Sequence, residues 1–129
     1  MTAAETRYDP DNIFARVLRG EIPNETVAES THALAFRDIR PQAPVHVLVI
    51  PKGPYVDAAD FGARASDEEI TDFARLLAKV AASEGVDPAS GGSGFRTISN
   101  AGTHGVQEVP HYHVHVLGGA TLGRMLPGM

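Results

Sequence analysis

The sequence contains no cysteine among its 129 residues. Disulfides, a thiolate nucleophile and a cysteine zinc site are therefore excluded, and the composition fits a reducing compartment, for which we expect the cytoplasm. Long hydrophobic runs are also missing. The longest, residues 45–50, is interrupted by His46 and is too short to span a bilayer, and the N-terminus lacks the pattern of a signal peptide. We expect no membrane partner.

Positive charge is scarce as well. The chain has 11 Lys and Arg against 16 Asp and Glu, which gives a formal net charge of -5. Because nucleic-acid binding needs a clustered Lys/Arg surface, we expect no nucleic-acid partner, although a small nucleotide needs only a few local donors. Length and a hydrophobic content of 43% suit a single domain over residues 1–129, with residues 1–10 and 120–129 as loosely ordered tails.

Hydrophobic spacing predicts two helices and five strands. Asp11 or Asn12 caps a short helix that Gly20 ends, and a capping box at Ser66 and Glu69 opens a long helix to about residue 84. The expected apolar face of the long helix comprises Ile70, Phe73, Ala74, Leu77, Val80 and Ala81. Strands are predicted at residues 26–29, 33–37, 45–50, 95–99 and 111–117, with a polar loop at residues 100–110. This order predicts an α+β fold with an antiparallel sheet.

The last predicted strand carries three of the six histidines of the chain. Strand side chains alternate, so His111, His113 and His115 share one face while Tyr112 and Val114 point to the other. Three imidazoles can attack phosphorus and shuttle protons near neutral pH. A metal site built from two of them and His46 is an alternative, as is a purely structural role. The outer Cα atoms are about 13 Å apart, so three strand histidines converge poorly on one ion.

Three segments of the sequence together resemble the Hint branch (histidine triad nucleotide-binding proteins) of the histidine triad superfamily. Residues 111–117, HYHVHVL, match the pattern His-φ-His-φ-His-φ-φ, in which φ is apolar, and two glycines follow. Upstream, residues 11–23, DNIFARVLRGEIP, and residues 35–52, AFRDIRPQAPVHVLVIPK, are similar to the opening blocks of that branch. The resemblance implies a HIT-like fold and a homodimer whose two sheets join into one. It also implies a purine-nucleotide site that hydrolyses nucleoside phosphoramidates or related monophosphate derivatives without a metal or other cofactor.

The same resemblance implies a role for each matching residue. His113 is the nucleophile that takes the nucleotidyl group, His115 contacts the phosphate and leaving group, and His111 and His46 support them in a proton relay. Asp38 binds the ribose hydroxyls, and an apolar pocket for the base is formed by Ile13, Phe14, Val17, Phe36 and Ile39. The remaining predicted substrate contacts come from one loop: Asn100, Gln107, Glu108 and Val109. Glu108 stands where relatives carry Ser, so we expect it to repel an anionic substrate, to select a cationic leaving group, or to point away from the site.

Several of these residues have a simpler interpretation. The apolar residues suit a hydrophobic core, Asp38 and Asn100 suit turns, and His46 suits a buried hydrogen-bonded position. Two other functions also stay open: a dinucleoside polyphosphate hydrolase or nucleotidyl transferase of the same superfamily, and a non-enzymatic nucleotide-binding interaction protein.

Overall fold

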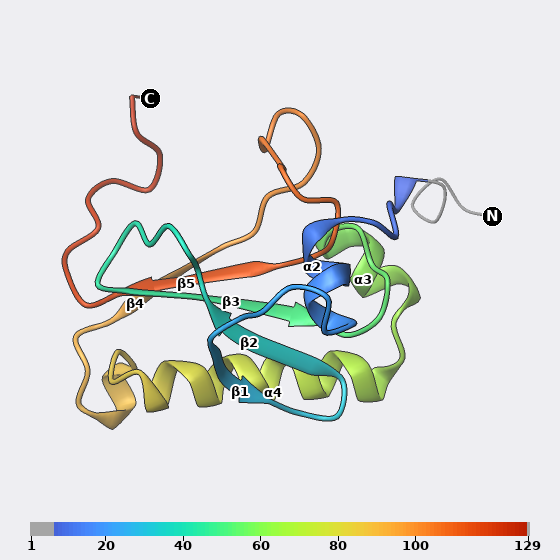
Figure 1. The fold of residues 1–129 in the computed structure, drawn as a ribbon. Coiled ribbons are helices and arrows are strands. Elements are labelled where there is room, and N and C mark those ends of the chain that lie inside the picture. The colour runs from blue at the N-terminus through green and yellow to red at the C-terminus, as the bar shows by residue number, and fades with distance from the viewer. Residues whose placement is uncertain (1–6, 129) are drawn as a thin grey trace.

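Five strands form one antiparallel sheet in the part of the chain that the structure, a computed structural model, describes, residues 7–128. They are β1 (Thr26–Glu29), β2 (Ala33–Arg37), β3 (Val45–Pro51), β4 (Phe95–Ile98) and β5 (Val114–Gly118), in the spatial order β1-β2-β3-β5-β4. Figure 1 shows a long helix running along one face of this sheet, with shorter helices at one end. The predicted α+β fold with a five-stranded antiparallel sheet is confirmed.

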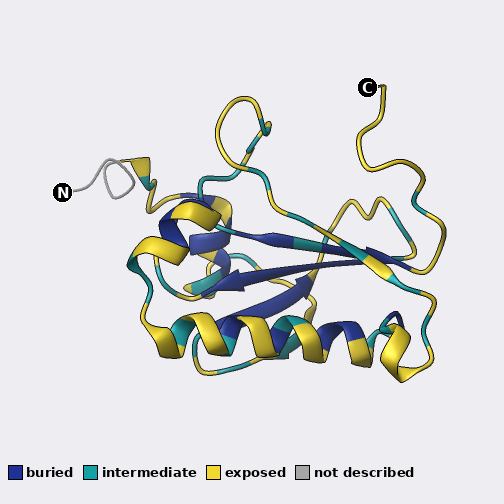
Figure 2. Ribbon diagram, turned by 180° about the vertical axis from the view of Figure 1, so that it is seen from behind, coloured by how far each residue is buried: buried dark blue, intermediate teal, exposed yellow. Residues whose placement is uncertain are grey.

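The long helix, α4 (Asp67–Ser83), begins at the predicted capping box. Ser66 Oγ accepts a hydrogen bond from the Glu69 N–H, and the Glu69 carboxylate accepts one from the Ser66 N–H, both at 3.1 Å. The helix buries Phe73, Leu76, Val80 and Ala81. These side chains cover the sheet face that carries Ala33, Ala35, Val47, Val49, Val114 and Val116, and the outer side of α4 is exposed (Figure 2).

The buried face of α4 differs from the expected one at three positions, Ile70, Ala74 and Leu76, and Leu77 is only partly buried. Ile70 is 36% exposed and Ala74 is exposed, whereas Leu76 is buried. Two adjacent leucines, Leu76 and Leu77, fit two overlapping helical faces, so apolar spacing alone does not choose between them.

The short helix α2 (Ile13–Leu18) covers the opposite face of the sheet. Asn12, not Asp11, caps it, because the Asn12 side chain accepts from the N–H groups of Phe14 and Ala15 at 2.9 Å. Phe14 and Val17 pack on Leu34, Phe36, Leu48 and Ile50. The sheet therefore has one face under α4 and another that α2 covers only in part.

Other expected boundaries are corrected. The last strand begins at Val114, not at residue 111, because the Tyr112 N–H bonds to the Tyr55 carbonyl instead of the ladder, and Pro51, opposite, has no N–H to offer. β3 runs one residue longer than expected, and β4 ends one residue earlier. Helix α3 (Ala58–Arg64) and the 3-10 turn η1 (Pro88–Ser90) were not predicted.

Part of the predicted N-terminal tail, residues 7–10, is ordered against the domain. Tyr8 bonds to His111, and Arg7 pairs with Asp57 at 3.3 Å, so residues 7–10 are held against the domain. Residues 1–6 and residue 129 lie outside the described residues. Within the described part, none of the helices is both long and apolar enough to cross a membrane.

Candidate active site

A cavity of about 550 Å³ opens on the sheet face that α2 leaves uncovered. Its wall contains most of the residues predicted for the site: Ile13, Phe14, Val17, Phe36, Asp38, Ile39, His46, Asn100, Glu108, Val109, His113 and His115. His111 and Gln107 are not part of the wall. Leu48 and Leu117 also line it and were not predicted from the sequence. Each lies two residues after a site histidine, so strand alternation could have identified both.

His113 lies in the cavity wall with one ring nitrogen already bound. Its Nδ1 is 2.7 Å from the backbone oxygen of His111. A carbonyl oxygen only accepts, so Nδ1 carries the proton and Nε2 keeps its lone pair. Burial lowers the pKa of His113, although the carboxylates of Asp38 and Glu108 act in the opposite direction. The neutral, Nδ1-protonated imidazole is the form that can act as a nucleophile at neutral pH.

His46 and His115 form a second hydrogen-bonded pair beside it. The Gln42 N–H donates to His46 Nδ1 at 3.0 Å, so the His46 proton is on Nε2. Nε2 is 2.9 Å from His115 Nδ1, which must then accept, and this leaves the His115 proton on Nε2. Burial lowers the pKa of His46 and lowers that of His115 to about 4. The neutral pair therefore presents one N–H donor, His115 Nε2. The ring centroids of His115 and His113 are 5.1 Å apart, so this donor lies beside the nucleophile.

His111 has no ring nitrogen free for a proton relay. The residue is fully buried, its Nε2 is 2.8 Å from the Pro51 backbone oxygen, and its Nδ1 is 2.7 Å from the Tyr8 hydroxyl. The expected relay role is therefore not supported by these contacts. What His111 gives the site is its backbone carbonyl, which holds His113.

Gln107 is used inside the loop rather than in the cavity. Its Nε2 donates to the backbone oxygens of Val56 and Val109, at 2.6 and 3.0 Å, and its Oε1 accepts from the Gly102 N–H at 3.2 Å. Both amide protons are therefore taken. The predicted substrate contact of Gln107 would have to break these bonds. The side chain instead links residues 102–109 to the segment before α3.

The same loop contains a strained residue. Val106 has a φ of 54°, a left-handed conformation that is unfavourable for a β-branched side chain. Its neighbour Gly105 lies so close to Ala101 that a Cβ at this position would be 2.6 Å from the Ala101 oxygen. Both residues line the cavity, so the tight turn sets the shape of the wall next to Glu108.

Asp38 combines the turn role and a place in the cavity. One carboxylate oxygen accepts from the Arg40 N–H at 2.8 Å, and the other lies 3.4 Å from His46 Nε2. Ligand atoms of Asp38, His46 and His115 all lie within 4.8 Å of one another, a spacing that could hold a metal ion. However, His46 Nε2 and His115 Nδ1 are hydrogen-bonded to each other at 2.9 Å. Two nitrogens bound to one tetrahedral zinc ion lie about 3.3 Å apart, so the pair has the spacing of a hydrogen bond.

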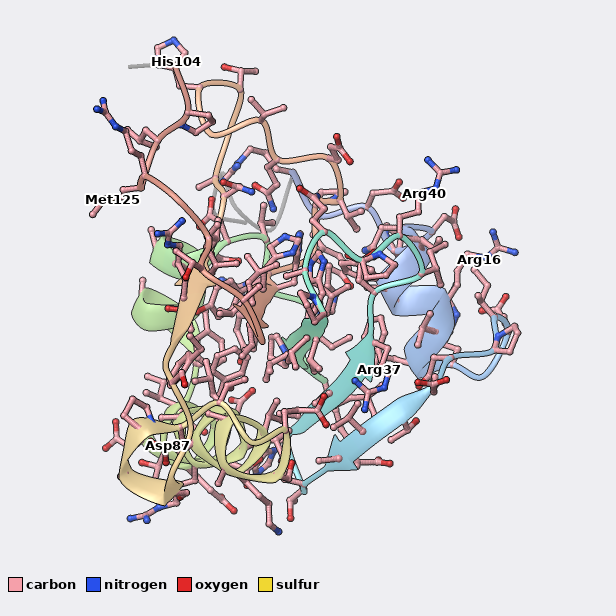
Figure 3. The ribbon with its side chains drawn as sticks, turned by 90° about the vertical axis from the view of Figure 1, so that its left-hand side faces the viewer. Arg16, Arg37, Arg40, Asp87, His104 and Met125 are labelled. Atoms are coloured by element: carbon pink, nitrogen blue, oxygen red, sulfur yellow. The ribbon has the colours of Figure 1, made fainter. Side chains whose placement is uncertain are left out.

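The charge in the wall is negative. Among the described residues that line the cavity, Arg37 is the one Lys or Arg, and its guanidinium is bound to Glu84 at 2.6 Å and to Glu25 at 2.7 Å. Figure 3 shows the Arg37 side chain at the end of β2. With Asp38 and Glu108 in the same wall, a bound phosphate would rely on N–H donors rather than on a free cation.

The chain is similar to known proteins in both sequence and structure. The model for the HIT domain matches residues 19–122. The chain is 54% identical to a 13.2 kDa HIT-like protein of Azospirillum brasilense over 120 residues, 92% of this chain and 94% of that protein. It is 40% identical to the purine nucleoside phosphoramidase of Escherichia coli over 116 residues, 90% and 93% of the two chains. A histidine triad protein from Clostridium difficile superposes with a TM-score of 0.76 at 38% identity, covering 90% of this chain and 96% of that one. The chain therefore belongs to the histidine triad (HIT) family, whose members include hydrolases.

Proposed function

We propose that this protein hydrolyses purine nucleoside phosphoramidates or related nucleoside monophosphate derivatives through a nucleotidyl intermediate on His113. The observation that carries the proposal is the fixed tautomer of His113, whose Nδ1–H is bound to a carbonyl at 2.7 Å and whose Nε2 lone pair is left for the cavity. The 40% identity to a purine nucleoside phosphoramidase supports the choice of substrate class.

In the first step, His113 Nε2 forms a bond to phosphorus and the bond from phosphorus to the leaving nitrogen breaks. The leaving nitrogen takes up one proton from Nε2 of His115 in its protonated form, which leaves His115 neutral. In the second step, water adds its oxygen to phosphorus, the bond to His113 breaks, and one proton of water goes to His115, which restores its protonated form. Two steps with lower barriers thus replace one direct attack by water.

Asp38 can assist this proton transfer. The anionic phosphoryl group favours the protonated form of His115, opposing the effect of burial on its pKa. A protonated His115 can no longer accept from His46 Nε2. That N–H can then turn to the Asp38 carboxylate, which is 3.4 Å away. Asp38 is also our candidate for binding the ribose hydroxyls.

The base is proposed to bind where apolar side chains meet the solvent. Ile39 is 87% exposed and Ile13 is 43% exposed, although both line the cavity, whereas Phe36 forms its buried floor. Exposed apolar surface beside a hydrogen-bonding site suits a flat heterocycle that leaves water on binding.

The test is turnover of adenosine 5′-phosphoramidate by the wild type and by His113→Ala. We expect the variant to lose at least about a thousandfold in kcat, because its nucleophile is missing, while AMP still binds. The matched control is His104→Ala. His104 stands at the outer end of its loop and points to the solvent (Figure 3), and this variant should keep the wild-type rate.

The alternatives give different results in the same assay. Faster turnover of a diadenosine polyphosphate than of the phosphoramidate would indicate a polyphosphate hydrolase. AMP binding without turnover of either compound would indicate a binding protein. Near wild-type hydrolysis by His113→Ala would show that the nucleophile is wrongly assigned, and sensitivity of that activity to a chelator would then favour a metal site.

A further inference from the structure

The nucleophile depends on a backbone oxygen that lies outside the sheet. His113 Nδ1 donates to the carbonyl of His111, but β5 begins only at Val114, and the pairing of β3 with β5 starts at Val49 and Val114. No ladder hydrogen bond therefore fixes the His111 carbonyl. Something other than the sheet must hold it in place.

Two contacts hold this carbonyl: the N–H of the same peptide unit, on Tyr112, donates to the Tyr55 backbone oxygen at 2.7 Å, and the side chain of His111 is buried beside it. Nε2 must donate to the Pro51 oxygen at 2.8 Å, because a carbonyl oxygen cannot donate. Full burial lowers the pKa of His111 to about 4, so the ring is neutral at pH 7 and its Nδ1 is a bare acceptor. An acceptor buried without a donor would be costly, so the absence of a donor would weaken the preference of His111 for this tautomer.

The Tyr8 hydroxyl is the donor to this acceptor. It lies 2.7 Å from His111 Nδ1, and the two rings are in tilted contact with centroids 5.6 Å apart. Partial burial raises the pKa of Tyr8, so its hydroxyl keeps its proton. Tyr8 belongs to the segment before α2, which lies outside residues 19–122, the part of the chain that the HIT-domain model matches.

From these contacts we infer that Tyr8 is a positioning residue for His113, acting through His111. The hydroxyl of Tyr8 fixes the Nε2–H tautomer of His111, this tautomer binds Pro51, and the anchored residue presents its carbonyl to His113 Nδ1. The nucleophilic Nε2 of His113 is thereby aimed into the cavity. The inference rests on the proposed function, because it assigns a partner to the proposed nucleophile.

Two Tyr→Phe variants test the inference. Tyr8→Phe removes the donor to His111. Tyr55→Phe removes a side-chain hydrogen bond of the same length, 2.7 Å, to Glu69 on the other side of the sheet, and keeps the Tyr55 backbone oxygen that binds the Tyr112 N–H. For Tyr8→Phe we expect kcat on adenosine 5′-phosphoramidate to fall about tenfold with little change in KM, because a misplaced nucleophile slows chemistry and leaves base and ribose contacts intact. For Tyr55→Phe both constants should stay at the wild-type values.

Nitrogen-15 NMR of the histidine rings gives a readout that general destabilisation would not produce. In the wild type, we expect a protonated Nε2 on His111 and a protonated Nδ1 on His113. In Tyr8→Phe, the Nδ1–H signal of His113 should broaden or shift, while Tyr55→Phe should leave it unchanged.

Three results would overturn the inference. One is a wild-type His111 protonated on Nδ1, which decides the matter even if Tyr8→Phe does not fold. Another is a wild-type kcat in Tyr8→Phe, and the third is an equal loss in both variants. Failure of the proposed function is distinct: the wild type would then not hydrolyse the phosphoramidate, although the tautomers of His111 and His113 could still be as inferred.

Discussion

Acidification should destabilise this protein through His111. Its imidazole is fully buried, and its pKa is lowered from 6.5 to about 4. Below pH 6.5 His111 is protonated in the unfolded chain, whereas in the folded chain it stays neutral until the pH is near 4. The stability of the fold therefore decreases as the pH falls through this window and loses nothing from His111 above it.

The size of the effect follows from the pKa difference. A separation of about 2.5 units corresponds to about 3 kcal/mol once both states are protonated. Between pH 7 and pH 5, where the unfolded state already carries the proton, the loss from His111 alone is about 2 kcal/mol. This is a large part of the free energy of unfolding of a typical domain.

Urea unfolding of the wild type and His111→Gln at pH 7 and pH 5 measures this contribution. The glutamine amide can still donate to the Pro51 oxygen but does not titrate. His46, His113 and His115, whose pKa values burial also lowers, are present in both proteins, so their effects cancel in the comparison. We expect the wild type to lose about 2 kcal/mol more than the variant on going from pH 7 to pH 5. Equal losses in the two proteins would refute the reasoning, and His104→Gln, at an exposed position, serves as the control.

Two further predictions concern selectivity and assembly. Glu108→Gln should lower kcat/KM for phosphoramidates with a cationic leaving group and raise it for those with an anionic leaving group, because the carboxylate lies in the cavity wall. Equal effects on all leaving groups would mean that Glu108 does not select between them. A homodimer is expected because β4 is an edge strand of the sheet. Two large apolar side chains, Phe95 on β4 and Ile70 on α4, are also more than a third exposed. Light scattering at micromolar concentration checks this, and a monomer mass would contradict it.

The sheet and two of its helices could be predicted from sequence because their signals are local. Alternation around His46 and the capping box at Ser66 each need only a few neighbouring residues. Helix α3 gave a weaker signal, since Phe61 is the one large apolar residue among its seven. Its cap, Asp57, which accepts from the Asp60 N–H at 2.9 Å, was the available clue.

Three contacts of the site histidines could not be predicted, because the bonds of His111 to Tyr8 and Pro51 and the bond of His46 to His115 join residues that are distant in sequence. Alternation shows that His111 and His113 share a side, but not that Tyr8, 103 residues away, folds back onto one of them. In the same way, the residue type of Gln107 suits a substrate contact. Only the folded loop shows that its amide is already bound to Val56 and Val109.

The charges around the cavity bear on which phosphate compounds suit it. Dinucleoside polyphosphates carry several negative charges, and sites for such groups normally supply Lys, Arg or a metal ion to offset them. Here the one cation in the described wall, Arg37, is already paired with two glutamates, while Asp38 and Glu108 add negative charge. A monoanionic phosphoramidate needs less compensation, and the Nε2–H of His115 can bind one phosphoryl oxygen. If its leaving group is an amine with a positive charge, Glu108 changes from a source of repulsion into a partner. For this reason we expect monoanionic substrates with cationic leaving groups to be favoured over polyphosphates.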